Sequence, residues 1–356
     1  MTGVQTCALP IYIYKDVTDF EHNDYNMNSV GTGPYKLVDY QSGSYLKFEA
    51  NENYYKGEPS IKNVVFQIIE NADTAILALQ NGEVDAYQMT PQQVKKLDLD
   101  ASNLTAYSYT EGRVGYLQIN CNRVTDENVR KALLFAMDRK AMDDAAFESD
   151  EYYSIPYTFL PTNSQFYTED GVEKYEQDVD KAKSMLEEAG VSGLKLKLGY
   201  ISSDAVQSAQ ALLIQEQLQE VGVTVELAGG DGTAIANAMK DPDNEYDMYL
   251  GGYIMGIDPD TFSSLFENDG AYNYMHYSGY DTIDQLFEEG RSELDESARK
   301  ETYAKLQAAV QDTGAFYPII SNNKILVVNN RIQGVEDAGL VPVYTFEDTS
   351  SLKIAE

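Results

Sequence analysis

The first part of the chain alternates apolar and polar residues in short runs, and this period of two predicts β-strands with one buried face. Gly, Ser and Pro separate the runs, as turn residues do. We predict strands at residues 35–40, 46–50, 64–69, 104–110 and 114–120. Residues 73–80 have a helical pattern instead, and Asn81-Gly82 after them is typical of a helix end with a left-handed residue.

The middle of the chain changes to helical periodicity. Thr125 or Asp126 is the predicted N-cap of a helix whose apolar stripe occupies positions 129, 132, 133, 136 and 137. A second helix is predicted at residues 179–189, where an apolar stripe ends at Gly190. Each helix therefore has one face suited to packing on a core.

The clearest pattern lies between residues 194 and 227. Leucines alternate at 194, 196 and 198, a helix follows at about 204–221, and apolar residues alternate again at 223, 225 and 227. Two strands joined by a helix predict a parallel pair with a right-handed crossover. The chain is therefore predicted to be an α/β protein.

The last part continues with elements of both kinds. We predict a strand at 246–252, a loop at 253–260, helices at 282–290 and 297–312, and strands at 324–329 and 343–346. The sequence has no internal repeat and no low-complexity segment.

Charge narrows the possible partners. The chain carries 26 Lys and Arg against 58 Asp and Glu, which gives a formal net charge of −32 at pH 7. This charge repels phosphate backbones and anionic lipids, so we exclude nucleic acid as a partner. The 356 residues suffice for about two domains, and no apolar run approaches the ~20 residues that span a bilayer.

No arrangement of catalytic or metal-binding residues stands out. The two histidines, His22 and His276, lie far apart in sequence, which gives a histidine triad or a zinc site little support. Asp241, Asp243 and Glu245 alternate like the start of a calcium loop, but the central Gly and the closing Glu are out of register. A Gly-rich phosphate loop is also absent from the sequence. We therefore expect no enzyme activity, no cofactor and no metal.

Tyrosine is unusually frequent, with 28 Tyr, 12 Phe and no Trp. Each tyrosine combines a large apolar face with one hydroxyl, which suits a pocket for varied ligands, although most tyrosines simply pack at domain edges. The two cysteines are Cys7 and Cys121, and Cys7 belongs to a segment that is discounted below. We therefore expect no internal disulfide.

Several short motifs follow one another in a specific order. They are VGTGPYKL at 30–37, ALQNGEVD at 78–85, VRKALLFAMD at 129–138, DKAKSMLEEAG at 180–190, DPD at 258–260, YSGY at 277–280 and RIQG at 331–334. Each motif alone is weak. Together they resemble the extracellular solute-binding protein family 5, which includes dipeptide-, oligopeptide- and nickel-binding proteins.

This resemblance implies a two-lobed, periplasmic-binding-protein-like α/β fold of type II, the dipeptide- and oligopeptide-binding class. Lobe I would take residues 12–117 and 314–356, and lobe II would take residues 118–313. The chain would cross between the lobes near 116–120 and near 313–318. Lobe I would be incomplete.

The first residues set this chain apart from its family. Residues 1–11 resemble a translated sequencing adapter of the kind found at the end of a metagenomic read, so we discount them as we would a fusion scar. We therefore expect a fragment whose missing part carries a signal peptide and, as in many lipoproteins of this group, a lipid-anchoring Cys.

The resemblance also implies where a ligand would bind. Family members place ligand contacts on the hinge strand, after the strand that precedes the crossover helix, and on the aromatic loop before the Asp-Pro motif. Those positions are Tyr116, Gln118, Tyr200, Ser202, Ser203, Tyr253, Ile254 and Met255.

Two anchors that peptide binders usually supply are missing at those positions. An Asp normally follows the aromatic residue and pairs with the ligand amine, but this chain has Met255-Gly256 there. Dipeptide binders also place an Arg before the crossover helix, where this chain has Ser-Ser-Asp204. Because a desolvated ion pair helps to set the substrate class, a zwitterionic dipeptide is not favoured. Asp258 is the candidate replacement for the amine anchor.

The function that the resemblance implies is delivery of a small solute, expected to be a peptide, to the permease of an ABC importer. Ligand contacts from both lobes would favour a closed state, so hinge closure would signal that the solute is bound. Such a protein works as a monomer in the periplasm or lipid-anchored at the outer face of the membrane. The alternatives are the same fold with an oligosaccharide or a metal chelate, and an α/β enzyme that acts on a small molecule.

Overall fold

The computed structural model describes residues 15–18, 31–147, 152–254, 258–277, 280–342 and 344–355. Their contacts divide the chain into two compact units: unit 1 is Met1–Tyr109 with Lys324–Glu356, and unit 2 is Thr110–Asn323. The adapter-like segment 1–11, His22 and Met255 lie outside the described residues. Among the described residues, no helix is both long and apolar enough to span a membrane.

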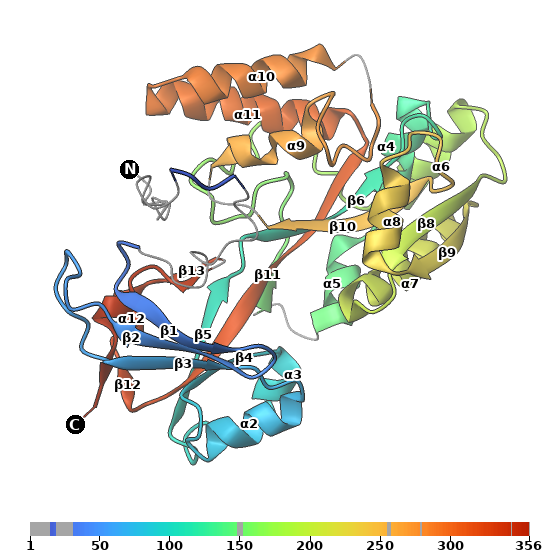
Figure 1. Cartoon of the computed structure of the whole chain (residues 1–356). Coiled ribbons are helices and arrows are strands. Elements are labelled where there is room, and N and C mark those ends of the chain that lie inside the picture. The colour runs from blue at the N-terminus through green and yellow to red at the C-terminus, as the bar shows by residue number, and fades with distance from the viewer. Residues whose placement is uncertain are drawn as a thin grey trace. The chain divides into compact units, whose positions relative to one another are not determined.

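Unit 1 begins with a three-stranded antiparallel sheet (Figure 1). Its strands are β1 (Tyr35–Gln41), β2 (Tyr45–Ala50) and β3 (Asn63–Gln67), in that order, so the first three predicted strands are confirmed. Several large apolar side chains in this region are exposed: Val38, Val65, Phe66, Ile68 and Leu77.

The predicted helix of unit 1 is also confirmed, as α2 (Ala72–Gln80). The side chain of Asn71 caps it by accepting a hydrogen bond from the N–H of Thr74 at 2.9 Å. The helix is followed by Gly82, whose φ of 73° few other residues adopt.

The remaining elements of unit 1 are short. They are β4 (Ala86–Met89), α3 (Pro91–Val94), β5 (Leu104–Thr110), β12 (Ile332–Gln333), α12 (Val335–Ala338), β13 (Leu340–Val341), β14 (Thr345–Phe346), the 3-10 helix η4 (Thr349–Ser351) and β15 (Lys353–Ile354). Strand β14 covers only part of the predicted strand 343–346, and residue 343 lies outside the described residues.

Strand β11 (Phe316–Asn329) differs from the prediction because it is one strand of 14 residues, whereas the sequence indicated a strand only at 324–329. The polar residues 321–324 in its middle interrupt the apolar pattern and hide its continuity. Its second part pairs with β4 from Ile325↔Met89 to Val328↔Ala86. Its first part pairs with β6 (Arg113–Ile119) in unit 2.

The boundaries between the two units differ from the expected lobe boundaries. The units meet in sequence at 109/110 and 323/324, whereas the expected lobe boundaries lie at 117/118 and 313/314. The physical reason is that β6 and the first part of β11 are hydrogen-bonded into the sheet of unit 2. Strand β6 and the first part of β11, where the lobe crossings were expected, therefore belong to the sheet of unit 2.

Unit 2 is built on a mixed sheet in the order β11-β6-β10-β8-β9. Strand β6 runs antiparallel to both β11 and β10 (Met248–Ile254). Strands β10, β8 (Lys195–Ile201) and β9 (Thr224–Gly230) are parallel to one another. The three parallel strands therefore end at the same edge of the sheet.

The predicted crossover is confirmed. Strands β8 and β9 pair in parallel, with Leu198 opposite Leu227, and α7 (Ala205–Glu220) connects them. The side chain of Asp204 caps this helix by accepting hydrogen bonds from the N–H groups of Val206 at 2.9 Å and Gln207 at 3.1 Å.

One face of the unit 2 sheet is covered by α4 (Glu127–Phe135), α5 (Arg139–Phe147), α6 (Val179–Glu188) and α7. Asp126 is the N-cap of α4, as predicted, but this helix ends before Met137, and α5 was not predicted. A large apolar core lies here, and Leu133, Leu198 and Ile214 are among its fully buried members.

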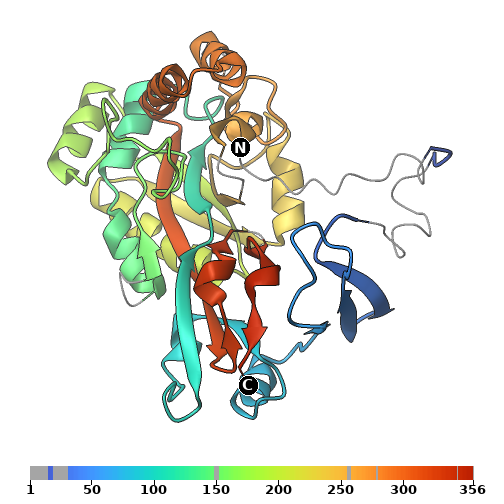
Figure 2. The ribbon, with the colours of Figure 1, turned by 90° about the vertical axis from the view of Figure 1, so that its left-hand side faces the viewer.

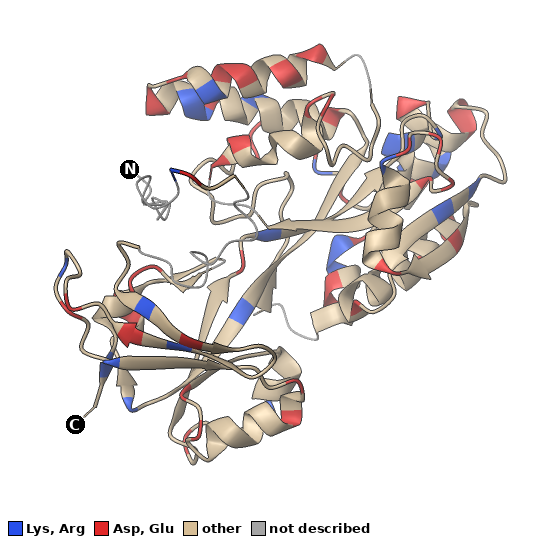
Figure 3. Ribbon diagram, viewed as in Figure 1, with Lys and Arg blue, Asp and Glu red and all other residues tan. Residues whose placement is uncertain are grey.

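A second apolar core includes residues of η3 (Pro259–Phe262), α9 (Ser263–Phe266), α10 (Asp281–Ser292) and α11 (Glu296–Asp312). Both predicted helices of this region are confirmed, and they lie side by side in Figure 1 and Figure 2. Two further elements of unit 2 are α8 (Gly232–Met239) and β7 (Tyr153–Ser154). Acidic residues are spread along α10 and α11 and over both units (Figure 3).

Candidate functional site

The residues that the sequence proposes as ligand contacts come from neighbouring strands of unit 2. Tyr116 lies opposite Gly251 and Gln118 lies opposite Tyr249 in the β6–β10 pair. Strand β8, which carries Tyr200, pairs with the other side of β10. In open α/β sheets, ligands bind beyond the carboxyl ends of parallel strands, which here are the ends of β8 and β10.

Tyr116 forms part of a packed aromatic wall. Its ring lies 4.8 Å from the ring of Phe316, and its side chain is only 6% exposed. Gly251 makes room for this ring, because a Cβ at that position would lie 2.7 Å from Cε2 of Tyr116. Burial raises the pKa of Tyr116 well above its usual value, so the hydroxyl stays protonated.

Tyr253 continues this wall toward the end of β10. Its hydroxyl lies 2.7 Å from Oγ of Ser264, and its ring lies 5.7 Å from the ring of Phe262 and 5.9 Å from that of Tyr272. Tyr272 is 44% exposed, and the neighbouring predicted residue Ile254 is 40% exposed. This end of the strand therefore offers both aromatic and aliphatic surface to a ligand.

A row of tyrosines extends the site beyond the predicted residues. Tyr272 contacts Tyr274 at 6.3 Å between ring centres, and Tyr274 contacts Tyr249 at 5.8 Å. Tyr249 was not among the predicted contacts because it precedes the predicted loop. The alternation of Tyr249, Gly251 and Tyr253 along β10 was the available signal, because residues two apart share one face of a strand.

The side chain of Gln118 lies in the interior of unit 2 and not at its surface. Its side chain is fully buried, and among the described residues neither its amide nitrogen nor its amide oxygen has a hydrogen-bond partner. Phe316 lies opposite it on β11. In this structure Gln118 therefore presents no polar atom to solvent.

Tyr200 and the two serines lie at the carboxyl end of β8. The ring of Tyr200 passes over Gly229 of β9, where a Cβ would lie 2.7 Å from its Cζ atom. The N–H of Ser202 donates to the carbonyl of Gly230 at 3.1 Å, while the side chains of Ser202 and Ser203 are exposed. The Ser202 hydroxyl also donates to the Gly230 carbonyl at 3.4 Å, and both exposed hydroxyls remain available to a ligand at this edge of the sheet.

Asp258 makes contacts within unit 2. Its Oδ1 atom accepts hydrogen bonds from the N–H of Asp260 at 3.0 Å and from Nη2 of Arg299 at 2.8 Å. These contacts hold the start of η3, for which Asp258 is the N-cap. The carboxylate therefore already has a cationic partner, and a ligand amine would have to share it.

Arg113 is a polar residue near the site that is not among the predicted contacts. It opens β6, lies opposite Ile254 and is partly buried. Its guanidinium lies on the strand at Gly252, where a Cβ would be 2.0 Å from Nη2. The contact between this arginine and a glycine of the adjoining strand was visible only once the register of β6 and β10 was known.

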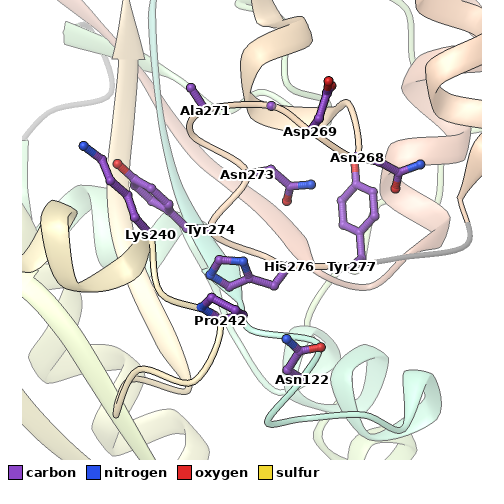
Figure 4. Close-up of a pocket in the computed structure, with 11 residues that line it drawn as sticks. Asn122, Lys240, Pro242, Asn268, Asp269, Ala271, Asn273, Tyr274, His276 and Tyr277 are labelled. Atoms are coloured by element: carbon purple, nitrogen blue, oxygen red, sulfur yellow. The ribbon is translucent and has the colours of Figure 1, made fainter.

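A pocket in unit 2 lies between α8 and the loop before α10, and Tyr274 of the tyrosine row is one of its lining residues (Figure 4). It encloses about 620 Å³ and is lined mainly by polar residues, among them Asn122, Lys240, Asn273, His276 and Tyr277. The imidazole Nε2 of His276 lies 2.7 Å from the carbonyl oxygen of Met239. None of the predicted ligand contacts lines this pocket.

The charged and nucleophilic side chains do not gather into a reactive set where the structure describes them. Burial raises the pKa of the Cys121 thiol to about 11, so the thiol is a poor nucleophile near neutral pH. Within the described ranges, no group of three or more His, Cys, Asp or Glu could hold a metal ion. The arrangement is suited to holding a molecule by aromatic, hydroxyl and guanidinium contacts.

Comparison with known proteins identifies a family whose sequence model matches most of this chain. Residues 4–274 match the model for bacterial extracellular solute-binding proteins, family 5 Middle. The chain is 27% identical over 353 residues to the oligopeptide-binding protein AppA of Bacillus subtilis, and the match covers 91% of this chain and 63% of AppA. It is 25% identical over 320 residues to the dipeptide-binding protein of Escherichia coli, covering 87% of this chain and 59% of the relative. Both matches span less than two thirds of the relative's own length.

A solved structure agrees with this result. The ABC transporter substrate-binding protein CtaP of Listeria monocytogenes superposes with a TM-score of 0.91 at 37% sequence identity. That match covers 98% of this chain and 72% of CtaP.

Proposed function

Because this chain belongs to the bacterial extracellular solute-binding proteins of family 5, we propose that it binds a small solute outside the cytoplasm and delivers it to an ABC importer. The solute we propose is a peptide. The single observation that carries this proposal is the tyrosine surface at the end of β10, where Tyr253 and Tyr272 are partly exposed close to Ile254. The names of the oligopeptide-binding and dipeptide-binding relatives support the choice of a peptide.

The aromatic surface suits peptides of varied sequence. Tyrosine rings contact side chains of many shapes through their faces, and their hydroxyls accept and donate hydrogen bonds. The exposed hydroxyls of Ser202 and Ser203 add polar contacts that a peptide backbone could use. This combination favours binding through the backbone and general shape of the ligand over recognition of a single side chain.

Hinge closure is the mechanism that we propose for delivery. The chain passes between the two units twice, at 109/110 and at 323/324, and two crossings allow a hinge. A solute that contacts both units stabilises the closed state by the difference between its affinities for the closed and open states. The permease of the importer would then recognise the closed monomer. The binding protein itself would be secreted or lipid-anchored, and it would release its solute unchanged.

A nonpeptide solute, such as an oligosaccharide or a metal chelate, is the second candidate. It is favoured by the ion pair between Asp258 and Arg299, which occupies the carboxylate that could otherwise anchor a peptide amine. A binding site without an amine anchor accepts N-blocked or uncharged ligands more readily than free dipeptides.

Isothermal titration calorimetry on the full chain separates these candidates. The chain is unfolded and refolded to remove any bound solute, and then titrated with tripeptides and pentapeptides, with their N-acetylated forms, with maltotriose and with nickel–histidine. Saturable binding of peptides without turnover supports the proposal. Binding of maltotriose or nickel–histidine alone would instead support the second candidate, and chemical conversion of any ligand would mean that the protein is an enzyme.

A further inference from the structure

Arg113 stands out because of its electrostatic surroundings. The other five arginines of unit 2 each have described partners: Arg123 pairs with Asp247, Arg291 with Asp260 and Arg299 with Asp258, while Arg130 and Arg139 donate to backbone carbonyls. Within the described ranges, the guanidinium of Arg113 forms no ion pair, hydrogen bond or stacking contact with an aromatic ring. This is unexpected in a chain with 58 acidic residues against 26 basic ones.

Gly252 leaves room for the guanidinium of Arg113 beside the backbone of β10. A Cβ at Gly252 would lie 2.0 Å from Nη2, 2.2 Å from Cζ and 2.5 Å from Nε of Arg113. A Cβ at Gly115 would lie 3.4 Å from Nη1. Gly252 therefore leaves the space that the guanidinium occupies, and any side chain at residue 252 would displace it, whereas a Cβ at Gly115 would lie close to Ile320 and only at contact distance from Nη1.

Arg113 lies at the strand end where the candidate site is located. It is opposite Ile254 at the carboxyl end of β10, so its side chain shares one face of the sheet with Ile254 and Gly252. Tyr116 and Tyr253 lie on the other face, and a ligand at the strand ends would have to contact both. A partly buried guanidinium has lost some of its water, which costs free energy unless an anion or hydrogen-bond acceptor compensates. A planar carboxylate suits it best, because two parallel N–H···O bonds can form at once.

We propose that Arg113 anchors a carboxylate of the bound solute, so that the preferred peptides are those with a free C-terminal carboxyl group. This inference rests on the proposed function, since it assigns one end of the peptide to one residue of the site. Because Asp258 already pairs with Arg299, the charged contact that sets specificity is with the acidic end of the ligand and not with its amine.

The test compares peptide acids with peptide amides. The full chain is refolded without solute and incubated with an equimolar pool of pentapeptides, each present as the free acid and as the C-terminal amide, and the bound peptides are quantified by mass spectrometry. A charge-assisted bidentate contact predicts that the acids bind ~10- to 100-fold more tightly than the amides. Arg113→Gln should abolish this preference, and Arg113→Lys should restore part of it.

Two further variants make the test specific. Gly252→Ala keeps every charge but displaces the guanidinium, so it should also reduce the preference for acids. Lys195→Gln removes one positive charge from an exposed position at the start of β8, and it should leave the preference unchanged. Thermal unfolding of each variant shows whether the fold is retained.

The outcomes separate this inference from the proposed function. If the wild-type chain binds acids and amides equally, or if Arg113→Gln retains the preference, Arg113 is not the anchor although peptide binding stands. If the wild-type chain binds no peptide of the pool, the proposed peptide function fails and the inference fails with it.

Discussion

Asp258 and Arg299 form an ion pair in unit 2, with Oδ1 of the carboxylate 2.8 Å from Nη2 of the guanidinium. The sequence suggested Asp258 as an anchor for a ligand amine. Its second hydrogen bond, from the N–H of Asp260, fixes the start of η3. The structure therefore gives this residue a role in local folding, and that role can be measured.

Replacing Asp258 with Ala should reduce stability more than it affects ligand choice. The loss of a helix cap and of a partly exposed ion pair should lower the free energy of unfolding by about 1 kcal/mol, as measured by urea denaturation. The matched control is Asp269→Ala, which removes the same charge from an exposed loop position. A large drop in the affinity for free peptides, with no drop for N-acetylated ones, would show that Asp258 does bind the amine.

Asp143 should make the stability of the protein fall as the pH rises. Burial raises its pKa to about 8, against the opposing effects of a 3.4 Å hydrogen bond from Gln210 and of the charge of Arg139. The folded state therefore holds a proton that the unfolded state releases near pH 4. The stabilisation is fully present below pH ~4 and is lost as the pH passes through about 8.

Urea denaturation between pH 4 and pH 9 tests this prediction. Asp143→Asn removes the titrating group, so the fall in the free energy of unfolding should become shallower. Asp180→Asn, at an exposed position on α6, should keep the wild-type profile. Identical profiles for the wild type and Asp143→Asn would contradict the assignment.

Gly251→Ala should disturb the aromatic wall of the site. A Cβ at this position would lie 2.7 Å from the ring of Tyr116 and 3.0 Å from the ring of Tyr249, and both rings are buried. Overpacking of this kind costs about 1–3 kcal/mol of unfolding free energy. It should also weaken solute binding, which calorimetry can measure.

Gly33→Ala is the matched control, because a Cβ at residue 33 would have no neighbour closer than 3.9 Å. Its stability should stay within about 0.5 kcal/mol of wild type. If Gly251→Ala proved equally harmless, the two tyrosine rings would have to be freer to move than their burial indicates.

Cys121 should react slowly with thiol reagents. Burial raises its pKa to about 11, and at pH 8 this lowers the thiolate fraction roughly a hundredfold relative to an exposed cysteine. The Cys7→Ser variant leaves Cys121 as the only cysteine, so the rate of its labelling by iodoacetamide can be followed by mass spectrometry. Full labelling should follow once urea unfolds the chain, and rapid labelling of the native protein would contradict the prediction.

Unit 2 should fold by itself. Its segment, Thr110–Asn323, is continuous and contains every described residue of the two apolar cores of unit 2 reported above. The isolated segment should therefore unfold in one cooperative transition when it is heated and followed by circular dichroism. A broad, noncooperative loss of signal would mean that unit 2 depends on unit 1 for its stability.

The sequence by itself determined the elements whose signals are local. The β8–α7–β9 crossover follows from apolar spacing along one continuous segment, and Asp204 caps α7 through atoms two and three residues away. Asp126 likewise marks the start of α4. The order of short motifs identified the family for the same reason, since each motif is read without knowledge of any other part of the chain.

Only the tertiary structure decided which of these residues meet. Tyr116 and Gly251 are neighbours because β6 and β10 pair in one register, and that register also places Arg113 against Gly252. The partners come from strands far apart in sequence, so no local pattern encodes the contact. Burial of the Gln118 side chain likewise depends on the packing of the whole unit, and the sequence could not have revealed it.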